Sequence, residues 1–256
     1  MEALDTVNDA RDLYRDAEAY DAQYAHYRDD LAFYRELALD QSGPVLELGA
    51  GTGRVTVELA RVAPEVVALE PVDEMRTRAQ ARLERAGVAS TVTLRADDAR
   101  EMAPSPRFAL VVAPFHMLMH LHALADQDAV LARARQALIP GGAFACDVFA
   151  PRFGPMGVLR REAALTSAAG RHQDLWLVQH HDPATQSVTS LYLLDETDEA
   201  GVVRRTRRRL HQRYFHRYEL ERALRGAGFA TVRIFGDFDR RPIIADAPRY
   251  VALARP

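Results

Sequence analysis

The sequence contains a single cysteine, Cys146, among 256 residues. One thiol cannot build a disulfide framework, so we expect a protein of a reducing compartment. No segment approaches the roughly 18 consecutive apolar residues that a membrane-spanning helix needs. The first residues, MEALDTVNDARDLYRD, are acidic and polar and lack the basic-then-apolar order of a secretory signal. We therefore expect a cytoplasmic protein that does not act on membranes.

Neither sign of charge is in clear excess. The chain carries 33 basic and 36 acidic residues, which gives a net charge of −3. Such a balance provides no general attraction to nucleic acid or to anionic membranes, and it argues against both as partners. Internal repeats and low-complexity linkers are also absent. With 48% hydrophobic residues, the chain is long enough for one large domain or one domain with an insertion.

Short apolar runs alternate with helical patterns between residues 44 and 149. The runs are almost continuously apolar, as strands buried on both faces are, so the alternation predicts a parallel sheet covered by helices on both sides. Before it, residues 8–39 show a helical pattern rich in aromatic residues, with Asp29 or Asp30 as a cap for LAFYRELAL. A helix over DQDAVLARARQAL is expected to end at Pro140-Gly141-Gly142, before a fifth strand, AFACDVF.

The pattern changes between residues 160 and 213. Extended runs are separated there by the turn sequences DPATQ and DEAG, which predicts an antiparallel meander. A helix over YELERALRGAG and the strands ATVRIFG and RYVALAR follow. The chain is therefore expected to form a parallel sheet, an inserted antiparallel layer, and closing elements of the first sheet.

Three glycines in five positions follow the first predicted strand, in VLELGAGTGR (Val45–Arg54). Because glycine loses more chain entropy on ordering than any other residue, a strand–glycine loop–helix order indicates a ligand close to the backbone at a helix N-terminus. The dinucleotide fingerprint GxGxxG fails, since Arg54 replaces its third glycine, and no P-loop GK[ST] follows. Glu70 ends the second predicted strand, where a carboxylate can hold both ribose hydroxyls. The pattern predicts a site for a nucleoside without phosphates.

The stretch ELGAGTGR resembles motif I of the class I S-adenosylmethionine-dependent methyltransferases. The similarity continues through ALEP, RADD, FALVVAPF, LIPGG and RALRGAGF, and it spans roughly residues 20 to 255. It is strongest to bacterial small-molecule enzymes of the sugar N,N-dimethyltransferase and glycine N-methyltransferase types. The resemblance implies an α/β fold with a Rossmann-like, seven-stranded, mostly parallel sheet flanked by helices, an N-terminal helical segment and a small antiparallel lid after the fifth strand.

The implied organisation has four parts. They are an N-terminal helical cap (1–42), a cofactor-binding core (43–150), an antiparallel lid (151–213), and the closing helix and strands of the core (214–256). The implied activity is methyl transfer from S-adenosylmethionine to a nitrogen or oxygen of a small polar molecule by in-line displacement, with S-adenosylhomocysteine as the product. If the chain associates with itself, we expect a homodimer.

The resemblance also implies which residues bind the cofactor. Those implied to line the methionine moiety are Glu47, Gly49, Ala50, Gly51 and Gly53. Glu70 is implied to bind the ribose hydroxyls, Pro71 and Met75 to pack on adenine, Asp97 to accept from its amino group, and Asp98 or Ala99 to offer a backbone amide. The segment implied to lie beneath the sulfonium is Ala113, Pro114 and Phe115.

The segment APFHMLMHLHAL follows the fourth predicted strand and carries His116, His120 and His122. An acceptor amine or hydroxyl must lose a proton, so a base with a near-neutral pKa is expected there. His120, with the leucine after it, matches a histidine–leucine pair of the sugar N-methyltransferases, in which that histidine is a candidate base. A histidine that only packs at a helix start is the alternative. HMLMH lacks the glutamate of the zinc-protease pattern and has no third ligand nearby, so we expect no metal.

Tyr20 and Tyr24 lie in the pattern YDAQY, which also resembles the family. The resemblance implies a tyrosine that closes over the cofactor with its hydroxyl near the methyl group or the carboxylate. Tyr24 is thus the second candidate catalytic residue, Tyr20 a candidate cofactor contact, and Arg28 a candidate partner of the cofactor carboxylate. Packing of an aromatic stripe is the alternative interpretation.

Six arginines lie in VVRRTRRRLHQR, from Arg204 to Arg213. On a strand they divide between two faces, and a solvated face that discourages edge pairing is the favoured interpretation. The run is the only support for RNA or protein as the methyl acceptor. Two further alternatives are a non-catalytic cofactor-binding protein and a nicotinamide oxidoreductase, against which Arg54 and the histidine-bearing segment argue.

Overall fold

The computed structural model describes residues 12–103, 105–167 and 170–256, and it divides into two compact units. The core unit comprises Arg28–Pro151 and Tyr214–Pro256. The antiparallel unit comprises the described residues up to Tyr27 together with Arg152–Arg213. The predicted N-terminal segment 1–42 thus contributes to both units. No helix of the described residues is long and apolar enough to span a membrane.

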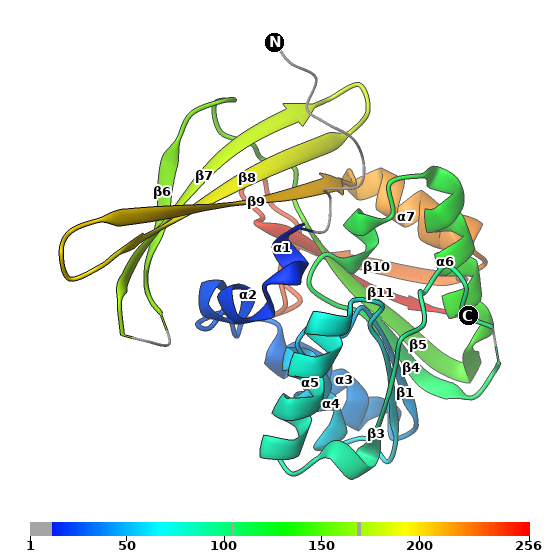
Figure 1. Ribbon diagram of the computed structural model, residues 1–256. Helices are drawn as coiled ribbons and strands as arrows, with labels where there is room; N and C mark the ends of the chain where they lie inside the picture. Colours follow the sequence, from blue (N-terminus) through cyan, green and yellow to red (C-terminus); the bar gives the residue numbers. More distant parts are fainter. Residues whose placement is uncertain (1–11, 104, 168–169) are drawn as a thin grey trace. The chain divides into compact units, whose positions relative to one another are not determined.

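The core unit is built on a seven-stranded sheet with the order β10-β11-β5-β4-β1-β2-β3 (Figure 1). The strands β1 to β5 run parallel, and β11 pairs antiparallel with both β5 and β10. The predicted Rossmann-like, mostly parallel sheet is therefore confirmed. Its strands are β1 (Val45–Leu48), β2 (Val66–Leu69), β3 (Val92–Arg95), β4 (Phe108–Ala113), β5 (Leu138–Phe149), β10 (Thr231–Phe235) and β11 (Arg249–Arg255).

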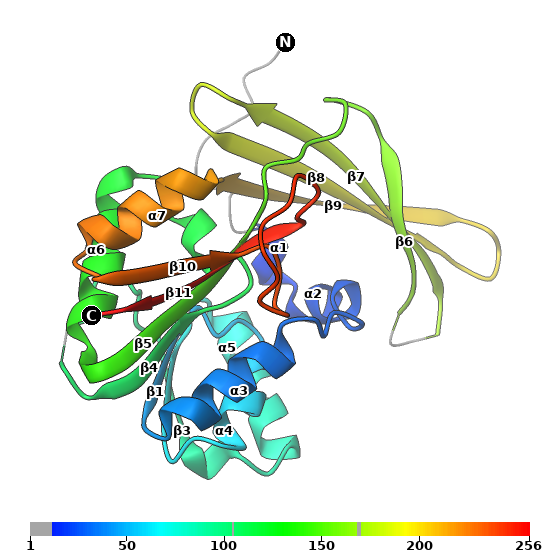
Figure 2. The ribbon, with the colours of Figure 1, turned by 180° about the vertical axis from the view of Figure 1, so that it is seen from behind.

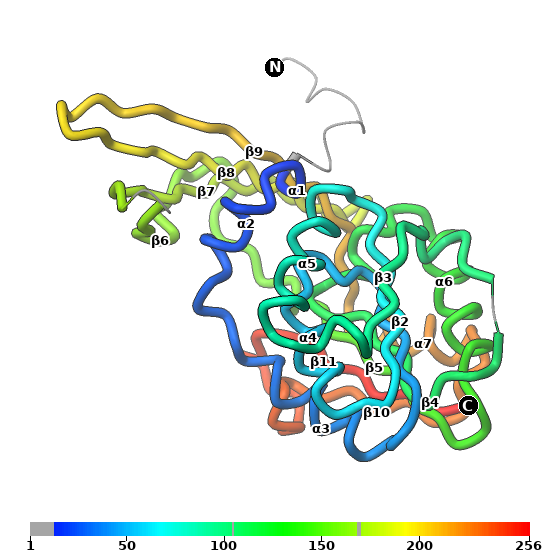
Figure 3. The backbone as a smooth tube through the Cα atoms, turned by 60° about the horizontal axis from the view of Figure 1, so that its bottom comes forward, coloured from blue at the N-terminus to red at the C-terminus, as the bar shows by residue number. Residues whose placement is uncertain are grey.

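The central strands form the hydrophobic core because they are apolar on both faces. Every residue of β1, β2 and β4 is buried. Helices lie on the two sides of the sheet (Figure 3): α3, α4 and α5 pack in sequence on one side, and α6 packs against α7 on the other. Their bounds are α3 (Leu31–Gln41), α4 (Arg54–Ala60), α5 (Asp73–Arg85), α6 (Leu124–Gln136) and α7 (Arg217–Gly226).

The predicted helical stretch 8–39 is not continuous, and residues 8–11 lie outside the described residues. The described part forms α1 (Asp12–Arg15), α2 (Ala17–Gln23) and α3. The interruption before Leu31 arises because the first two helices pack on the antiparallel sheet, whereas α3 packs on α4 and β4. Asp30 takes the predicted N-cap position, but its side chain makes no cap hydrogen bond.

Pro140-Gly141-Gly142 was expected to separate a helix from the fifth strand. Instead α6 ends at Gln136, and β5 starts at Leu138 and runs through the three residues. Gly141 has a left-handed φ of +82°, and a Cβ on Gly142 would lie 3.0 Å from the Ala109 carbonyl oxygen. The glycines therefore allow β5 to bend along β4, where the register shifts.

The antiparallel unit contains a four-stranded sheet with the order β6-β7-β8-β9 (Figures 1 and 2). The strands are β6 (Arg160–Thr166), β7 (His172–Asp182), β8 (Ser187–Thr197) and β9 (Val203–Arg213). All neighbouring strands pair antiparallel, so the predicted meander is confirmed. The helix α1 packs on β9, and α2 packs on β6.

Candidate active site

The predicted cofactor residues of the core unit follow four neighbouring strands of the sheet, in the order β4-β1-β2-β3. Ligands of open α/β sheets bind beyond the carboxyl ends of the strands, and these four ends lie at one edge. The segments that follow them are Gly49–Gly53 after β1, Glu70–Met75 after β2, Asp97–Ala99 after β3, and Pro114–Phe115 after β4.

The loop after β1 depends on its glycines. Gly49, Gly51 and Gly53 have φ values of +74°, +58° and +81°, in the left-handed region that side chains avoid. Space is limited as well, because a Cβ on Gly49 would lie 2.8 Å from Cγ of Met117. The amides of Gly49 and Ala50 both donate to the carbonyl of Leu69 at 2.9 Å. The loop is thereby held at the start of α4.

Glu70 connects this loop to the end of β2. Its Oε2 accepts a hydrogen bond from the amide of Gly51 at 2.7 Å, and its Oε1 accepts one from the amide of Val72 at 2.9 Å. The side chain is largely buried, with 6% of the residue exposed. The carboxylate is thus fixed beside the glycine loop, as a group that binds the ribose of a nucleoside must be.

Glu47 supplies a second carboxylate, fully buried within β1. Neither of its oxygens has a hydrogen-bond partner of good geometry among the described residues. Burial raises the pKa of this carboxyl to about 7, although the Thr56 hydroxyl and the Arg54 charge oppose the rise. A buried carboxylate without a partner fits a cationic group, and the amino group of S-adenosylmethionine is one. The glycine loop and Glu47 therefore fit the cofactor that the sequence implies.

Replacement of Glu47 with glutamine should stabilise the protein at pH 8 in the absence of cofactor. The pKa of the Glu47 carboxyl is about 7 in the folded chain, whereas its ordinary value is 4.5. As the pH rises between these values, the unfolded state ionises this carboxyl while the folded state keeps it protonated, so wild-type stability falls by up to ~3 kcal/mol. Glutamine does not titrate, so its advantage in thermal midpoint should grow from pH 5 to pH 8. An advantage independent of pH would contradict this assignment.

The residues expected at the adenine ring lie after β2 and β3. Met75 is buried in α5, and its Cε is 3.8 Å from the position that a Cβ on Gly51 would take. Asp97 pairs with Arg95 at 2.5 Å, whereas Asp98 receives two hydrogen bonds from the Arg100 guanidinium, at 2.7 and 3.0 Å. Pro71 is exposed, whereas Ala99 is buried.

The segment after β4 is conformationally strained. Ala113 and Pro114 are buried, and Phe115 and His116 follow with φ values of +50° and +64°. Two consecutive non-glycine residues in the left-handed region are unusual and occur mainly at functional sites. The amide of Phe115 donates to Oδ1 of Asp147 at 2.8 Å, which holds the segment on β5.

Asp147 is the largest omission of the sequence analysis. It is fully buried in β5 and accepts a hydrogen bond from the Tyr34 hydroxyl at 2.7 Å. Nδ1 of His116 lies 3.1 Å from its Oδ2, without the alignment of a hydrogen bond. Burial alone would raise the pKa of Asp147, but His116, Tyr34 and the Phe115 amide outweigh it and lower that pKa. The signal was present in AFACDVF, where one carboxylate interrupts an apolar run.

His120, the predicted base, ends a short 3-10 helix, Met117–His120, and is half-buried. The i, i+4 spacing of His116 and His120 suggested a shared helix face, but a 3-10 helix has three residues per turn, so the two do not stack. Within the described residues, no group of three or more metal-binding side chains is placed to hold a metal ion.

Tyr20 and Tyr24 belong to the antiparallel unit. Their rings lie 4.8 Å apart, and Tyr14 packs on Tyr20 at 5.7 Å. Burial, together with the neighbouring Tyr192, raises the pKa of Tyr24 well above its usual value. Its phenol therefore stays protonated at neutral pH and can donate a hydrogen bond but not act as a base. Arg28 is exposed and belongs to the core unit.

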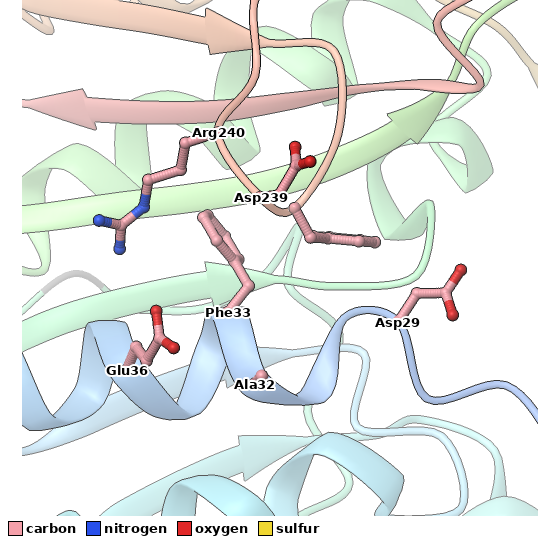
Figure 4. A pocket seen from close by; sticks show the side chains of 7 residues that line it. Asp29, Ala32, Phe33, Glu36, Asp239 and Arg240 are labelled. Atoms are coloured by element: carbon pink, nitrogen blue, oxygen red, sulfur yellow. The ribbon is translucent and has the colours of Figure 1, made fainter.

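A separate open pocket of about 380 Å³ lies between α3 and the loop after β10 (Figure 4). Phe33 rises from α3 toward the loop that carries Asp239 and Arg240. None of the predicted site residues lines this pocket. It is therefore distinct from the strand ends where the predicted residues gather.

Residues 45–142 match the model of a family described as "Methyltransferase domain". An uncharacterized methyltransferase of Geobacillus kaustophilus is 32% identical over 132 residues, which are 50% of this chain and 57% of that protein. The match thus spans little more than half of the curated relative.

Solved structures match over most of their length. The CcbJ methyltransferase of Streptomyces caelestis is 25% identical with a TM-score of 0.73, over 90% of this chain and 97% of that chain. CalS10, an amino pentose methyltransferase of Micromonospora echinaspora, was solved with S-adenosylmethionine bound. It is 21% identical with a TM-score of 0.74, over 93% of this chain and 97% of that chain. At this sequence identity, the similarity to CalS10 shows a shared fold.

Proposed function

We propose that this protein is a class I S-adenosylmethionine-dependent methyltransferase and that it transfers a methyl group to a nitrogen or oxygen of a small polar molecule. The observation that carries the proposal is the glycine loop with Glu70 fixed on the Gly51 amide. The relatives support a small acceptor, because CalS10 is described as an amino pentose methyltransferase.

Each part of the site has a task in such a reaction. The bound cofactor supplies a methyl group already activated on a sulfonium. The loop amides and the carboxylates of Glu47 and Glu70 bind and orient it, because positioning is the main lever in an in-line displacement. The lone pair of the acceptor atom forms the new bond to the methyl carbon while the carbon–sulfur bond breaks. The acceptor also loses a proton, which a nearby base takes.

His120 is the proposed base, and His120→Ala should lower kcat by about 100-fold while leaving cofactor affinity nearly unchanged. The reason is that the imidazole acts on the acceptor and not on the cofactor. His122→Ala, two residues further, is the matched control and should retain activity. If His120→Ala lost cofactor affinity together with turnover, His120 would have a structural role.

A second candidate base is His116, because the buried Asp147 carboxylate lies against its Nδ1. An acidic partner of this kind orients an imidazole and stabilises its protonated form. A general base must be unprotonated to act, so if His116 is the base, His116→Asn rather than His120→Ala should remove the acidic limb of the pH–kcat profile. The two variants therefore assign the proton transfer to one histidine.

The proposed function itself is tested by formation of S-adenosylhomocysteine. The protein should convert S-adenosylmethionine when supplied with small amines, amino sugars or hydroxylated compounds, and fail with RNA or protein substrates. Turnover with RNA alone would favour the alternative drawn from the arginine run. Cofactor binding without turnover on any acceptor would indicate a non-catalytic cofactor-binding protein.

A further inference from the structure

One arginine of β9 differs from its neighbours. The predicted solvated face is correct for Arg204, Arg205 and Arg207, which are exposed, and Arg205 pairs with Asp195 through hydrogen bonds of 2.6 and 2.7 Å. It is wrong for Arg208, of which only 3% is exposed. Alternation distinguishes Arg208 from Arg205 and Arg207, which point to the opposite face. Arg204 shares the face of Arg208 but lies at the exposed start of β9.

Among the residues that the structure describes, the guanidinium of Arg208 is buried without a hydrogen-bond partner. Its Nε, Nη1 and Nη2 are all inaccessible, and none makes a hydrogen bond within the part of the chain that the structure describes. Arginine is almost never buried unless it is paired, because the charge loses its hydration. Burial accordingly lowers the pKa of Arg208, and the nearby Asp16, Tyr24 and Tyr192 only oppose that effect.

The groups around this guanidinium are suited to an anion. Tyr192 stands directly opposite Arg208 on β8, so the two side chains share one face of the sheet. The hydroxyls of Tyr192 and Tyr24 interact with each other, and Nε2 of Gln23 donates to the Tyr24 hydroxyl at 3.0 Å. Tyrosine hydroxyls donate hydrogen bonds, and both remain protonated because burial raises their pKa values.

We propose that Arg208, with Tyr192 and Tyr24, forms a binding site for one oxyanion group of a small molecule, a carboxylate or a phosphate. The planar guanidinium fork matches both groups in geometry and would gain the hydrogen bonds that it lacks. All three residues belong to the antiparallel unit.

The short helices α1 and α2, which pack on this sheet, are consistent with entry of a ligand. The helix α1, which packs on β9, has four residues, and α2 has seven. Helices this short are marginal by themselves in water and take their stability from packing. They can therefore shift to admit a ligand more readily than a long helix could.

Thermal unfolding with inorganic phosphate or acetate as the probe tests the site. At a concentration about ten times its dissociation constant, phosphate should raise the thermal midpoint of the wild-type protein by about 3 °C. Arg208→Met should abolish the rise, and Tyr192→Phe should reduce it. Arg207→Met, an exposed arginine on the other face of the same strand, should respond like the wild type.

The source of the anion is distinguished by glucose 6-phosphate and glucose as further probes. If the sugar phosphate shifts the midpoint more than phosphate does, a larger molecule carries the group, whereas equal shifts indicate the free ion. Glucose alone should have no effect.

If Arg208 instead had a structural role, Arg208→Met would be less stable than the wild type even without an anion. The proposed anion site predicts the opposite. Without any anion, Arg208→Met should be at least as stable as the wild type, because it removes an unpaired buried charge. A variant that unfolds, or one that keeps the full phosphate response, would overturn the proposal. So would a wild-type protein that responds to neither probe.

Discussion

Replacing Glu70 with alanine is expected to weaken S-adenosylmethionine binding by about 100-fold. The carboxylate holds the amides of Gly51 and Val72 and is proposed to bind the ribose. Hydrogen bonds to a charged group contribute about 1.5–3 kcal/mol each, and losing two of them has an effect of this size. Isothermal titration calorimetry measures the affinity directly.

Two controls distinguish a binding role of Glu70 from a general loss of structure. Glu74→Ala changes an exposed glutamate in the first turn of α5 and should leave the affinity unchanged. Circular dichroism should show that Glu70→Ala keeps its secondary structure. An unchanged affinity in Glu70→Ala would refute the assignment of this residue.

Arg54→Met is expected to lower the free energy of unfolding by about 3–5 kcal/mol. The guanidinium donates to both oxygens of Asp30, at 2.5 and 2.7 Å, and the Asp30 carboxylate is fully buried. Loss of the arginine leaves that charge without its partner. Because burial already raises the pKa of Asp30, protonation should relieve the defect, so the loss should shrink as the pH is lowered.

Urea denaturation of a matched set of variants checks this prediction. Arg61→Met breaks an exposed ion pair with Glu58 at the end of α4 and should cost less than about 1 kcal/mol. The double variant Asp30→Asn with Arg54→Met removes the buried charge and should recover much of the loss. Equal effects of Arg54→Met and Arg61→Met would contradict a special role for the buried pair.

Arg54 also illustrates what the sequence pattern could reveal. Its position breaks the dinucleotide fingerprint and so argues against a pyrophosphate loop. The partner of Arg54 was not predictable. Asp30 was interpreted as a helix cap, whereas its carboxylate pairs with the Arg54 guanidinium at the start of α4. Hydrophobic periodicity predicts where strands and helices lie, but pairing between residues distant in the chain depends on the packing that results.

The residues of the candidate site also fall into those that local sequence patterns predict and those that depend on packing. Glycine spacing and strand ends located Gly49, Glu70 and the segment after β4, because local patterns carry that information. The contact of Asp147 with His116 and the burial of Arg208 arise from strand pairing and from the face on which a side chain falls. A run of six arginines does not indicate which of them is enclosed.

Calorimetric titration of the wild-type protein with S-adenosylmethionine and, separately, with NADH tests the central claim most directly. The glycine loop has Arg54 in place of a third glycine, and the Glu47 carboxylate has no hydrogen-bond partner within the described ranges. Together they predict saturable binding of S-adenosylmethionine and none of NADH. Binding of NADH without binding of S-adenosylmethionine would contradict the account.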